Sequence, residues 1–566
     1  MRVPLQRRRV RGWVLEADAA PATERHRLVP VRAVVSAGPP PDVVALCEWA
    51  AWRWAGPRAA FLRAAGAPNV VDPRAEVSLE AAVFPAREAP SELTDLPDAR
   101  ARVIRWPPTA PRAELVRSLV AAEGSTLVVV PDPAEQDALA SVLADDGREV
   151  VVVRSELPAA TRTAVWDRAR RGACVVVGGR LAPFAPVPDL EGVIVLDDAD
   201  EALVEERAPT WNARDLAAER ARRAGVPHTV VSPAPTLESV VGATEVPPPP
   251  ARERAGWPRL EVVDLREQAP GAGPWTEELA AALRRALDDD GRAVCVLNRR
   301  GRARLLACPV CRELARCERC TAALREVDGS LVCPRCGHEQ VAACRHCGTA
   351  GLRRLRVGVV GARDHVGALV PRAQVVAVDA SSAPLPTWDI AVGTETVFHR
   401  LAAEGAVARR RPVRLVAFVD FDQELLAPRY RAAEQARWLL VRAARLVGPR
   451  GEGGIVLTQT RLPDDPTLVA VGAGDPSRAD HEEVERRRAL RFPPFGGLAE
   501  LTGDPAALDA AVALLGPPLE VLGPHDGAAL IRAPDVAALA DGLAAADFST
   551  AREHGRLRIA VDPVRI

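Results

Sequence analysis

Four C-x-x-C pairs dominate the middle of the chain, and they account for eight of its eleven cysteines. Two thiolates separated by two residues can bind one tetrahedral zinc ion, so four pairs supply the ligands of two closed sites. Disulfide bonds are the alternative, but the first residues have no apolar segment typical of a secretion signal, and a reducing cytosol would keep such bonds open. The sequence therefore predicts two Zn²⁺ per chain, bound by Cys308, Cys311, Cys317, Cys320, Cys333, Cys336, Cys344 and Cys347.

On either side of the cysteines, short runs of β-branched residues alternate with stretches rich in alanine, leucine and arginine. TLVVVPD, EVVVVRS and GVIVLDD are such runs in the first half, and AQVVAVD, WDIAVGT and VRLVAFVD in the second. This alternation is typical of parallel sheets covered by helices. The Pro-rich segment EVPPPPARERAGW separates the two halves and is expected to be a stiff linker. The sequence predicts an α/β fold with two lobes, the second interrupted by the cysteine-rich module.

The basic residues are all arginine, because none of the 74 is lysine. A GxxxxGK[ST] phosphate loop and a Schiff base to a protein lysine are therefore excluded. The formal net charge is -1, so affinity for nucleic acid has to come from local patches. One patch spans residues 299–356, where 13 arginines stand against 5 acidic residues. Eight thiolates with two Zn²⁺ would halve this excess of positive charge. The arginines would contact DNA phosphates, neutralise the thiolates, or do both.

Four stretches resemble the family of primosomal protein N-prime, the bacterial replication restart protein PriA. They are ACVVVGGRLAPFAPVPDLEGVIVLDDAD, APTWNARDLAAERA, VVSPAPTLES, and LNRRGRARLLACPVC with the cysteine pairs that follow it. The resemblance runs from about residue 40 to the C-terminus. It implies two RecA-like helicase lobes, and it implies that the outer cysteine pairs share one zinc ion and the inner pairs the other. Cys308, Cys311, Cys344 and Cys347 would then form the outer site.

The resemblance also divides the chain, whose 566 residues suffice for about four domains. Trp49 and Trp52, one helical turn apart, are expected in the core of the second unit. The units are a partial N-terminal DNA-binding domain (1–35), a winged-helix-like domain (36–95), degenerate helicase lobe 1 (96–245), the linker and start of lobe 2 (246–307), the zinc-binding module (308–347), the remainder of degenerate lobe 2 (348–465) and a small α+β C-terminal domain (466–566).

The family's nucleotide-binding loop is altered in this chain. Where the family has the glycine-rich sequence GSGKT, residues 106–113 read WPPTAPRA, and their prolines remove backbone N–H groups that would hold phosphate. Arg112 stands at the position of the lysine, but its planar fork differs from a compact ammonium group. Ala113 lacks the hydroxyl that would bind Mg²⁺.

Two further motifs of the family are altered. Asp197-Asp198-Ala199-Asp200 replaces Asp-Glu-Glu-His; Asp197 could still bind a metal ion, whereas Asp198 is one methylene shorter than the glutamate that would activate water. Acidic residues that cap a helix are the alternative for this segment. In the last motif only Arg445 is in register with the family's arginines. We therefore expect a chain that is not an enzyme and does not use ATP, with a degenerate nucleotide site at Arg112, Asp197, Asp198 and Arg445.

Two groups of arginines are assigned to DNA binding. The first resembles the strand with which the family's N-terminal domain approaches a nascent DNA end, and it consists of Arg7, Arg8, Arg9 and Arg11. The second follows the cysteine pairs, where contacts between arginine and phosphate are expected, and it consists of Arg353, Arg354 and Arg356.

The resemblance implies a replication restart protein that binds stalled or branched forks and promotes primosome assembly and loading of the replicative helicase, without helicase activity of its own. Its expected partners are branched DNA, primosome proteins, the replicative helicase and single-stranded DNA-binding protein. An active ATP-dependent 3'-5' DNA helicase with an atypical nucleotide site is one alternative, and a zinc-containing DNA-binding scaffold outside replication is another. With no apolar run of membrane-spanning length, the chain is expected in the cytoplasm, associated with the nucleoid and not with a membrane.

Overall fold

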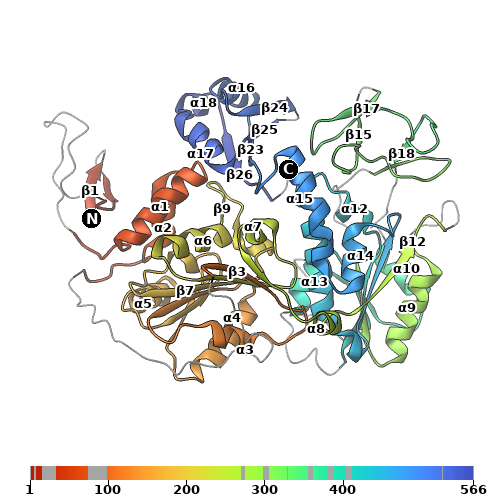
Figure 1. The fold of residues 1–566 in the computed structure, drawn as a ribbon, viewed down its shortest axis with the longest axis horizontal. Coiled ribbons are helices and arrows are strands. Elements are labelled where there is room, and N and C mark those ends of the chain that lie inside the picture. The colour runs from red at the N-terminus through yellow and green to blue at the C-terminus, as the bar shows by residue number, and fades with distance from the viewer. Residues whose placement is uncertain are drawn as a thin grey trace.

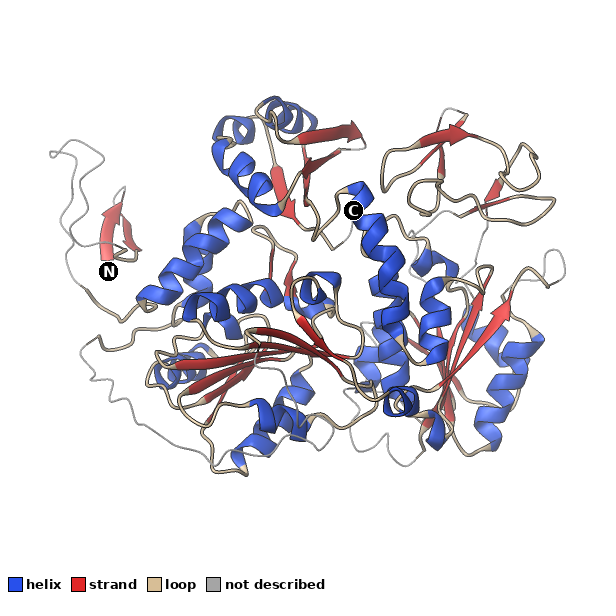
Figure 2. Cartoon of the chain, in the orientation of Figure 1, coloured by secondary structure: helices blue, strands red, loops and turns tan. Residues whose placement is uncertain are grey.

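Two parallel sheets covered by helices lie side by side, with smaller units packed above them (Figures 1 and 2). The computed structural model describes residues 2–5, 8–15, 34–73, 99–268, 274–297, 305–327, 329–354, 361–379, 387–402, 411–525 and 527–564. Arg7 and Arg356 lie outside these residues, as does most of the LNRRG segment. The expected fold of two α/β lobes with an inserted cysteine-rich module is confirmed.

Lobe 1 contains a seven-stranded parallel sheet in the order β11-β3-β10-β7-β4-β6-β5. Its central strands are rich in valine and buried, as expected where helices cover both faces. Asp132 begins α4 by accepting hydrogen bonds from the N–H groups of Ala134 and Glu135. The strands are β3 (Ala101–Arg105), β4 (Ser125–Val129), β5 (Val150–Val153), β6 (Val175–Gly178), β7 (Leu190–Leu196), β10 (His228–Ser232) and β11 (Thr244–Val246), and the helices α3 (Ala113–Leu119), α4 (Pro133–Ala144), α5 (Ala159–Ala169), α6 (Ala213–Ala224) and α7 (Leu237–Val240); the short pair β8 (Val204–Glu205) and β9 (Trp211–Asn212) follows β7.

Lobe 2 contains a six-stranded parallel sheet in the order β12-β22-β21-β13-β20-β19. Helix α13 belongs to this lobe and stands between the two sheets (Figure 1). The strands are β12 (Arg259–Asp264), β13 (Arg292–Val296), β19 (Val375–Val378), β20 (Ile390–Gly393), β21 (Val413–Phe418) and β22 (Ile455–Thr460), and the helices α8 (Pro250–Ala255), α9 (Glu277–Asp288), α10 (Ala362–Leu369), α11 (Thr396–Ala402), α12 (Asp422–Leu425) and α13 (Ala432–Val447).

The cysteine-rich module leaves lobe 2 after β13 and returns before α10. The antiparallel pair β14 (Leu306–Ala307) and β18 (Arg353–Arg354) closes its base. Its remaining strands form a small antiparallel sheet of β15 (Arg325–Val327), β16 (Ser330–Val332) and β17 (Glu339–Val341).

The C-terminal unit is a four-stranded antiparallel sheet in the order β24-β25-β23-β26, and it begins at Gly497. Helices α14 (Pro466–Ala473) and α15 (Asp480–Leu490), which the sequence assigned to this unit, precede it. α14 packs against β12 and α13 of lobe 2, because its apolar residues Leu468 and Val471 join that core. The unit contains β23 (Gly497–Gly503), α16 (Pro505–Ala513), β24 (Glu520–His525), β25 (Ala528–Ala533), α17 (Val536–Ala545), α18 (Ser549–Glu553) and β26 (Leu557–Val561).

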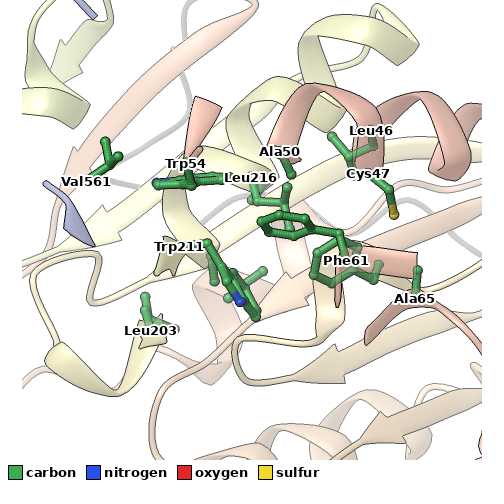
Figure 3. Close-up of a cluster of buried hydrophobic side chains, with 14 of the residues drawn as sticks. Leu46, Cys47, Ala50, Trp54, Phe61, Ala65, Leu203, Trp211, Leu216 and Val561 are labelled. Atoms are coloured by element: carbon green, nitrogen blue, oxygen red, sulfur yellow. The ribbon is translucent and has the colours of Figure 1, made fainter. Parts of the chain in front are cut away.

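The N-terminal segment forms the hairpin β1 (Arg2–Leu5) and β2 (Arg8–Arg11) and the helix pair α1 (Pro41–Arg53) and α2 (Arg58–Ala65). The helix pair packs against α6 of lobe 1 and α17 of the C-terminal unit. Trp54, rather than Trp49 or Trp52, is the fully buried tryptophan there, and Phe61 stacks on it (Figure 3). Within the described residues, no helix of this structure combines the length and apolar character needed to cross a membrane.

Candidate nucleotide cleft and metal centres

Each C-x-x-C pair folds into the same tight turn. The residue after the second cysteine adopts a left-handed conformation, and its N–H donates a hydrogen bond of 2.8–3.0 Å to the carbonyl of the first cysteine. This geometry turns two thiols toward one point, which is what a shared metal ion requires. The left-handed residues are Arg312, Thr321, Gly337 and Gly348.

The eight thiols gather into two clusters, and the ligand atoms of each lie within 4.8 Å of one another. Sulfur atoms approach to 3.4–3.6 Å across each cluster, far longer than a disulfide bond and close to the spacing around a tetrahedral metal ion. Each cluster could therefore hold one metal ion, for which zinc is the expected element. The outer cluster is Cys308, Cys311, Cys344 and Cys347, and the inner one is Cys317, Cys320, Cys333 and Cys336, the nested arrangement that the resemblance implied.

The two clusters differ in their surroundings. All four inner thiols are buried in one apolar core with Tyr430, Leu490 and Phe492. Arg335, itself buried, donates hydrogen bonds to the carbonyls of Cys320 at 2.9 Å and Ala427 at 2.5 Å, and so connects the inner cluster to lobe 2. In the outer cluster, by contrast, Cys347 is exposed and Cys311 half-buried.

This difference predicts two separate steps of metal release. With the zinc-loaded protein and a coloured chelator, we expect the outer ion to leave about tenfold or more faster, because its ligands need less opening of the fold to reach solvent. Cys347→Ser should abolish the fast step alone. His346→Ala, an exposed neighbour that we predict is not a ligand, should change neither step. A single step in the unmodified protein, or loss of both steps in Cys347→Ser, would contradict this assignment.

In the cleft between the lobes, the altered motifs converge on Asp197. Arg112 at the start of α3 approaches the Asp197 carboxylate at 2.8 Å and also pairs with Glu135 of α4. From α13 of lobe 2, Arg445 donates two hydrogen bonds to Asp197, at 2.7 and 2.8 Å. The structure therefore brings together Arg112, Asp197 and Arg445, and it adds Glu135, which the sequence analysis did not identify.

The charges in this cluster depend on one another. Burial disfavours the Asp197 carboxylate, but the guanidinium groups of Arg112 and Arg445 outweigh burial and lower its pKa. Burial raises the pKa of Glu135, and the nearby Asp197 carboxylate adds to that effect. Burial likewise opposes the charge on Arg112, yet Asp197 and Glu135 raise its pKa above the ordinary value. The cluster thus holds a charged arginine at the position where the family has lysine.

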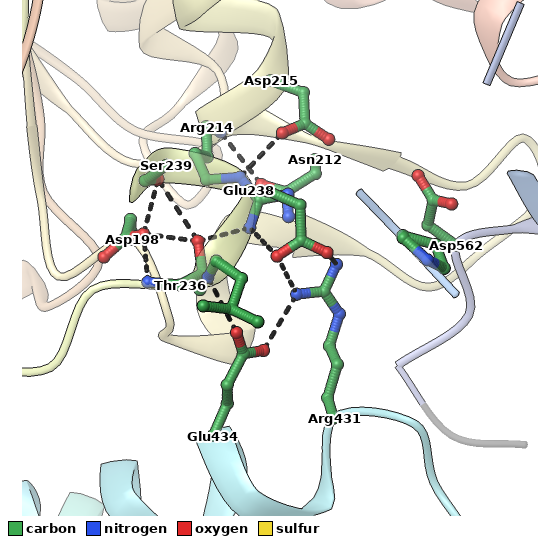
Figure 4. A network of polar contacts seen from close by, with 12 residues as sticks. Asp198, Asn212, Arg214, Asp215, Thr236, Glu238, Ser239, Arg431, Glu434 and Asp562 are labelled. Atoms are coloured by element: carbon green, nitrogen blue, oxygen red, sulfur yellow. Dashed lines mark hydrogen bonds and ion pairs between the residues drawn. The ribbon is translucent and has the colours of Figure 1, made fainter. Parts of the chain in front are cut away.

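Asp198 does not join this cluster. Its carboxylate accepts hydrogen bonds from the N–H of Thr236 at 2.9 Å and from the hydroxyls of Thr236 and Ser239 at 2.6 Å (Figure 4). These partners belong to the VVSPAPTLES segment, which begins within β10 and continues beyond its end. Asp198 therefore connects two motifs of lobe 1 and takes no part in the cluster around Asp197.

Asp200 and Arg442 form a second contact between the lobes. Asp200 accepts a hydrogen bond from the N–H of Ala202, as expected of a capping residue, and its other oxygen accepts from Arg442 at 2.9 Å and from Trp438 at 3.2 Å. Arg442 was not predicted from the sequence, although it precedes Arg445 by three residues and so shares its helix face. A crevice of about 450 Å³ lies beside these residues, lined by Arg180, His399 and others of both lobes.

The residues assigned to DNA binding are described only in part. Arg8, Arg9 and Arg11 lie on β2. Arg353 is exposed on β18 at the base of the metal module, with Arg354 next to it. Their role in DNA binding stays a prediction.

The fold and the site define a class of protein with two helicase-like lobes and a paired four-cysteine module. Residues 1–66 match the model of the PriA "3'DNA-binding domain (3'BD)". The "Probable replication restart protein PriA" of Mycobacterium bovis is 32% identical over 558 residues, covering 92% of this chain and 83% of the relative. The chain belongs to the family of replication restart protein PriA.

More distant relatives agree with this family. The "Replication restart protein PriA" of Haemophilus influenzae is 28% identical over 365 residues, covering 61% of this chain and 50% of the relative. Among solved structures, a DEAD box protein from Methanococcus jannaschii aligns with 70% of this chain and 87% of its own, at 10% identity and a TM-score of 0.29, which is too distant to carry an argument.

The prediction that the chain is not an enzyme is wrong, because the chain belongs along most of its length to a DNA helicase family. That prediction rested on the altered loop, on Asp198 in place of a glutamate, and on a last motif in which only Arg445 is in register. Arg112, Asp197 and Arg445 nevertheless meet in the interlobe cleft, so the altered residues have not dispersed the site. Departures in sequence at single positions of the loop do not show inactivity.

Proposed function

We propose that this protein binds branched DNA at stalled replication forks and promotes assembly of the primosome that loads the replicative helicase. The observation that carries the proposal is the likeness over 92% of the chain to a relative named for replication restart. Primosome proteins, the replicative helicase and single-stranded DNA-binding protein are the partners that this role implies. It places the protein in the cytoplasm, at the nucleoid.

We expect exposed arginines on and beside the metal module to contact DNA. Five of its arginines are exposed, whereas Arg335 is buried under the inner cluster. Arginine contacts the phosphates of DNA and displaces counterions when it binds, so affinity should depend strongly on salt. The exposed arginines are Arg316, Arg319, Arg325, Arg345 and Arg353.

Fork binding is tested by comparing a labelled fork with a duplex of equal length at several salt concentrations. We expect tighter binding to the fork. Replacing Arg353, Arg354 and Arg356 by alanine should reduce the slope of log K against log salt by about 2 to 3, the loss of three phosphate contacts. The matched control replaces three exposed arginines of β12 and α9, Arg259, Arg284 and Arg285. Equal affinity for fork and duplex would favour a scaffold outside replication.

An ATP-dependent DNA helicase with an atypical nucleotide site is the second candidate function. The meeting of Arg112, Asp197 and Arg445 in the cleft between two parallel-sheet lobes favours it. An arginine at this place can stabilise the charge that develops on a transferred phosphoryl group.

This candidate predicts ATP hydrolysis that single-stranded DNA stimulates. Arg445→Ala should reduce turnover by about 10³-fold or more, as loss of such an arginine does in other phosphoryl-transfer enzymes. Asp197→Asn should also abolish the stimulated rate. Asp137→Asn, an exposed acidic residue of α4, serves as the control and should retain it. A stimulated rate that survives both cleft substitutions would come from a different site or a contaminant. If the unmodified protein shows no ATP hydrolysis stimulated by single-stranded DNA, the helicase candidate is rejected and only fork binding remains proposed.

A further inference from the structure

One face of α13 is charged and polar, and it contacts lobe 1 along its whole length. From Arg431, which precedes the helix, to Arg445 near its end, the residues of this face recur every three or four positions, the spacing of one helical face. The opposite face, with Ala436, Leu440 and Val447, is buried in the core of lobe 2. Helix α13 is therefore fixed to its own lobe by apolar packing and to the other lobe by polar contacts.

Three ion pairs connect this face to lobe 1. At the far end of α13, Arg445 pairs with Asp197 at 2.7 Å. One turn earlier, Arg442 pairs with Asp200 at 2.9 Å. At the beginning of the helix, Arg431 pairs with Glu238 of α7 at 2.6 Å (Figure 4).

Hydrogen bonds between the lobes accompany these ion pairs. Glu434 accepts from the backbone N–H of Leu237 at 2.8 Å, Trp438 donates to Asp200 at 3.2 Å, and Gln435 donates to Glu201 at 3.1 Å. Most of these side chains are largely buried, with Asp197 only 2% exposed and Glu238 11% exposed. Water and salt screen such contacts less than they screen surface pairs.

Arg112 supplies positive charge to two carboxylates on the lobe 1 side of the cleft, those of Asp197 and Glu135. Without a cation on the lobe 1 side, the buried carboxylates of Asp197 and Glu135 would repel each other, and Asp197 would depend on Arg445 alone. Arg112 lies between them and contacts both. A chain of alternating charges, Glu135, Arg112, Asp197 and Arg445, thus crosses the cleft without nucleotide or metal.

We propose that these contacts form a latch that holds the two lobes closed in the protein free of nucleotide and DNA, with Arg112 as its built-in cation. A separate connection between the lobes lies at α8, in the segment that links them, where Arg105 of β3 pairs with Glu253 of α8 at 3.4 Å and with Asp475 at 2.8 Å. If the latch is broken, the lobes should therefore move apart while they stay joined at α8, and the apolar core of each lobe should stay intact. The latch concerns the conformation of the free protein and is independent of the proposed fork binding.

The test measures the distance between the lobes without any ligand. Dyes are attached through azide-bearing residues at the exposed positions Asp145 in lobe 1 and Asp289 in lobe 2, because the eleven cysteines preclude thiol labelling. Single-molecule energy transfer should show one closed population in the unmodified protein. In Asp197→Asn/Asp200→Asn, the ratio of closed to open molecules should fall by about tenfold or more, the effect of losing charge-assisted hydrogen bonds.

Two further variants make the outcome decisive. Arg442→Gln/Arg445→Gln breaks the same ion pairs by changing their partners in lobe 2, and it should open the lobes to the same extent. This variant keeps the test valid if the aspartate variant does not fold. Asp137→Asn removes an exposed acidic residue of lobe 1 that pairs within its own lobe, and it should leave the closed population unchanged. A closed population that persists in the arginine variant, or an open one in the unmodified protein, would overturn the latch.

Discussion

In Arg487→Met, the free energy of local unfolding of α13 and α15 is expected to fall by about 3–5 kcal/mol. This is the usual cost of removing one partner from a buried ion-pair network. The Arg487 side chain is fully buried and approaches three carboxylates, Glu434 and Glu483 at 2.8 Å each and Glu238 at 3.5 Å. Burial disfavours the Glu434 carboxylate, but Arg487 and Arg431 outweigh burial and lower its pKa to about 2. Without Arg487, these buried carboxylates lose their shared counterion.

Hydrogen exchange read at the amides of α13 and α15 measures this effect, since the multi-domain chain has no single unfolding transition. The loss corresponds to exchange faster by roughly 10² to 10³-fold or more in Arg487→Met. Arg488→Met is the matched control, because Arg488 is the next residue, is 55% exposed, forms its ion pair with the exposed Glu485 and otherwise lies over the Phe495 ring. A surface pair of this kind contributes about 0–1 kcal/mol. Similar exchange in the two variants would contradict a buried network that stabilises this junction.

The local features of the fold could be predicted from the sequence because they depend on neighbouring residues. Runs such as TLVV at 126–129 became buried parallel strands, and the spacing of each C-x-x-C pair fixed the turn that brings its two thiols together. The nested order of the pairs came from the family resemblance, since spacing alone is compatible with either pairing.

Contacts between distant segments could not be predicted in this way. Arg112 and Asp197 were identified one motif at a time, but their pairing with Glu135 and Arg445 depends on how four segments meet in space. The prediction about enzyme activity failed because it counted altered residues in three motifs, whereas the chain along most of its length belongs to a DNA helicase family.

The helix pair at the N-terminus shows the same limit for packing. Trp49 and Trp52 share a helical turn and were the expected core residues, but both are only half-buried. Trp54, which follows the end of α1, is 1% exposed. It lies in one apolar cluster with Leu203 of lobe 1 and Val561 of the C-terminal unit (Figure 3). The burial of Trp54 depends on these two distant units, which no periodicity within α1 reveals.

Trp54→Ala is therefore expected to reduce the protection of α1 and α2 against hydrogen exchange by about 3–5 kcal/mol, the range for truncating a buried large aromatic residue. The indole contacts Trp49 edge-on at 5.3 Å between ring centroids and stacks on Phe61 at 6.3 Å, so its removal leaves a cavity at a junction of three units. Trp52→Phe is the matched control, because it keeps an aromatic ring and removes the hydrogen bond from the indole to Asp541; it should cost about 0.5–1.5 kcal/mol. If the control lowers protection as much as Trp54→Ala does, the α1–α2 pair depends on its exposed contact with α17 and not on the shared apolar core.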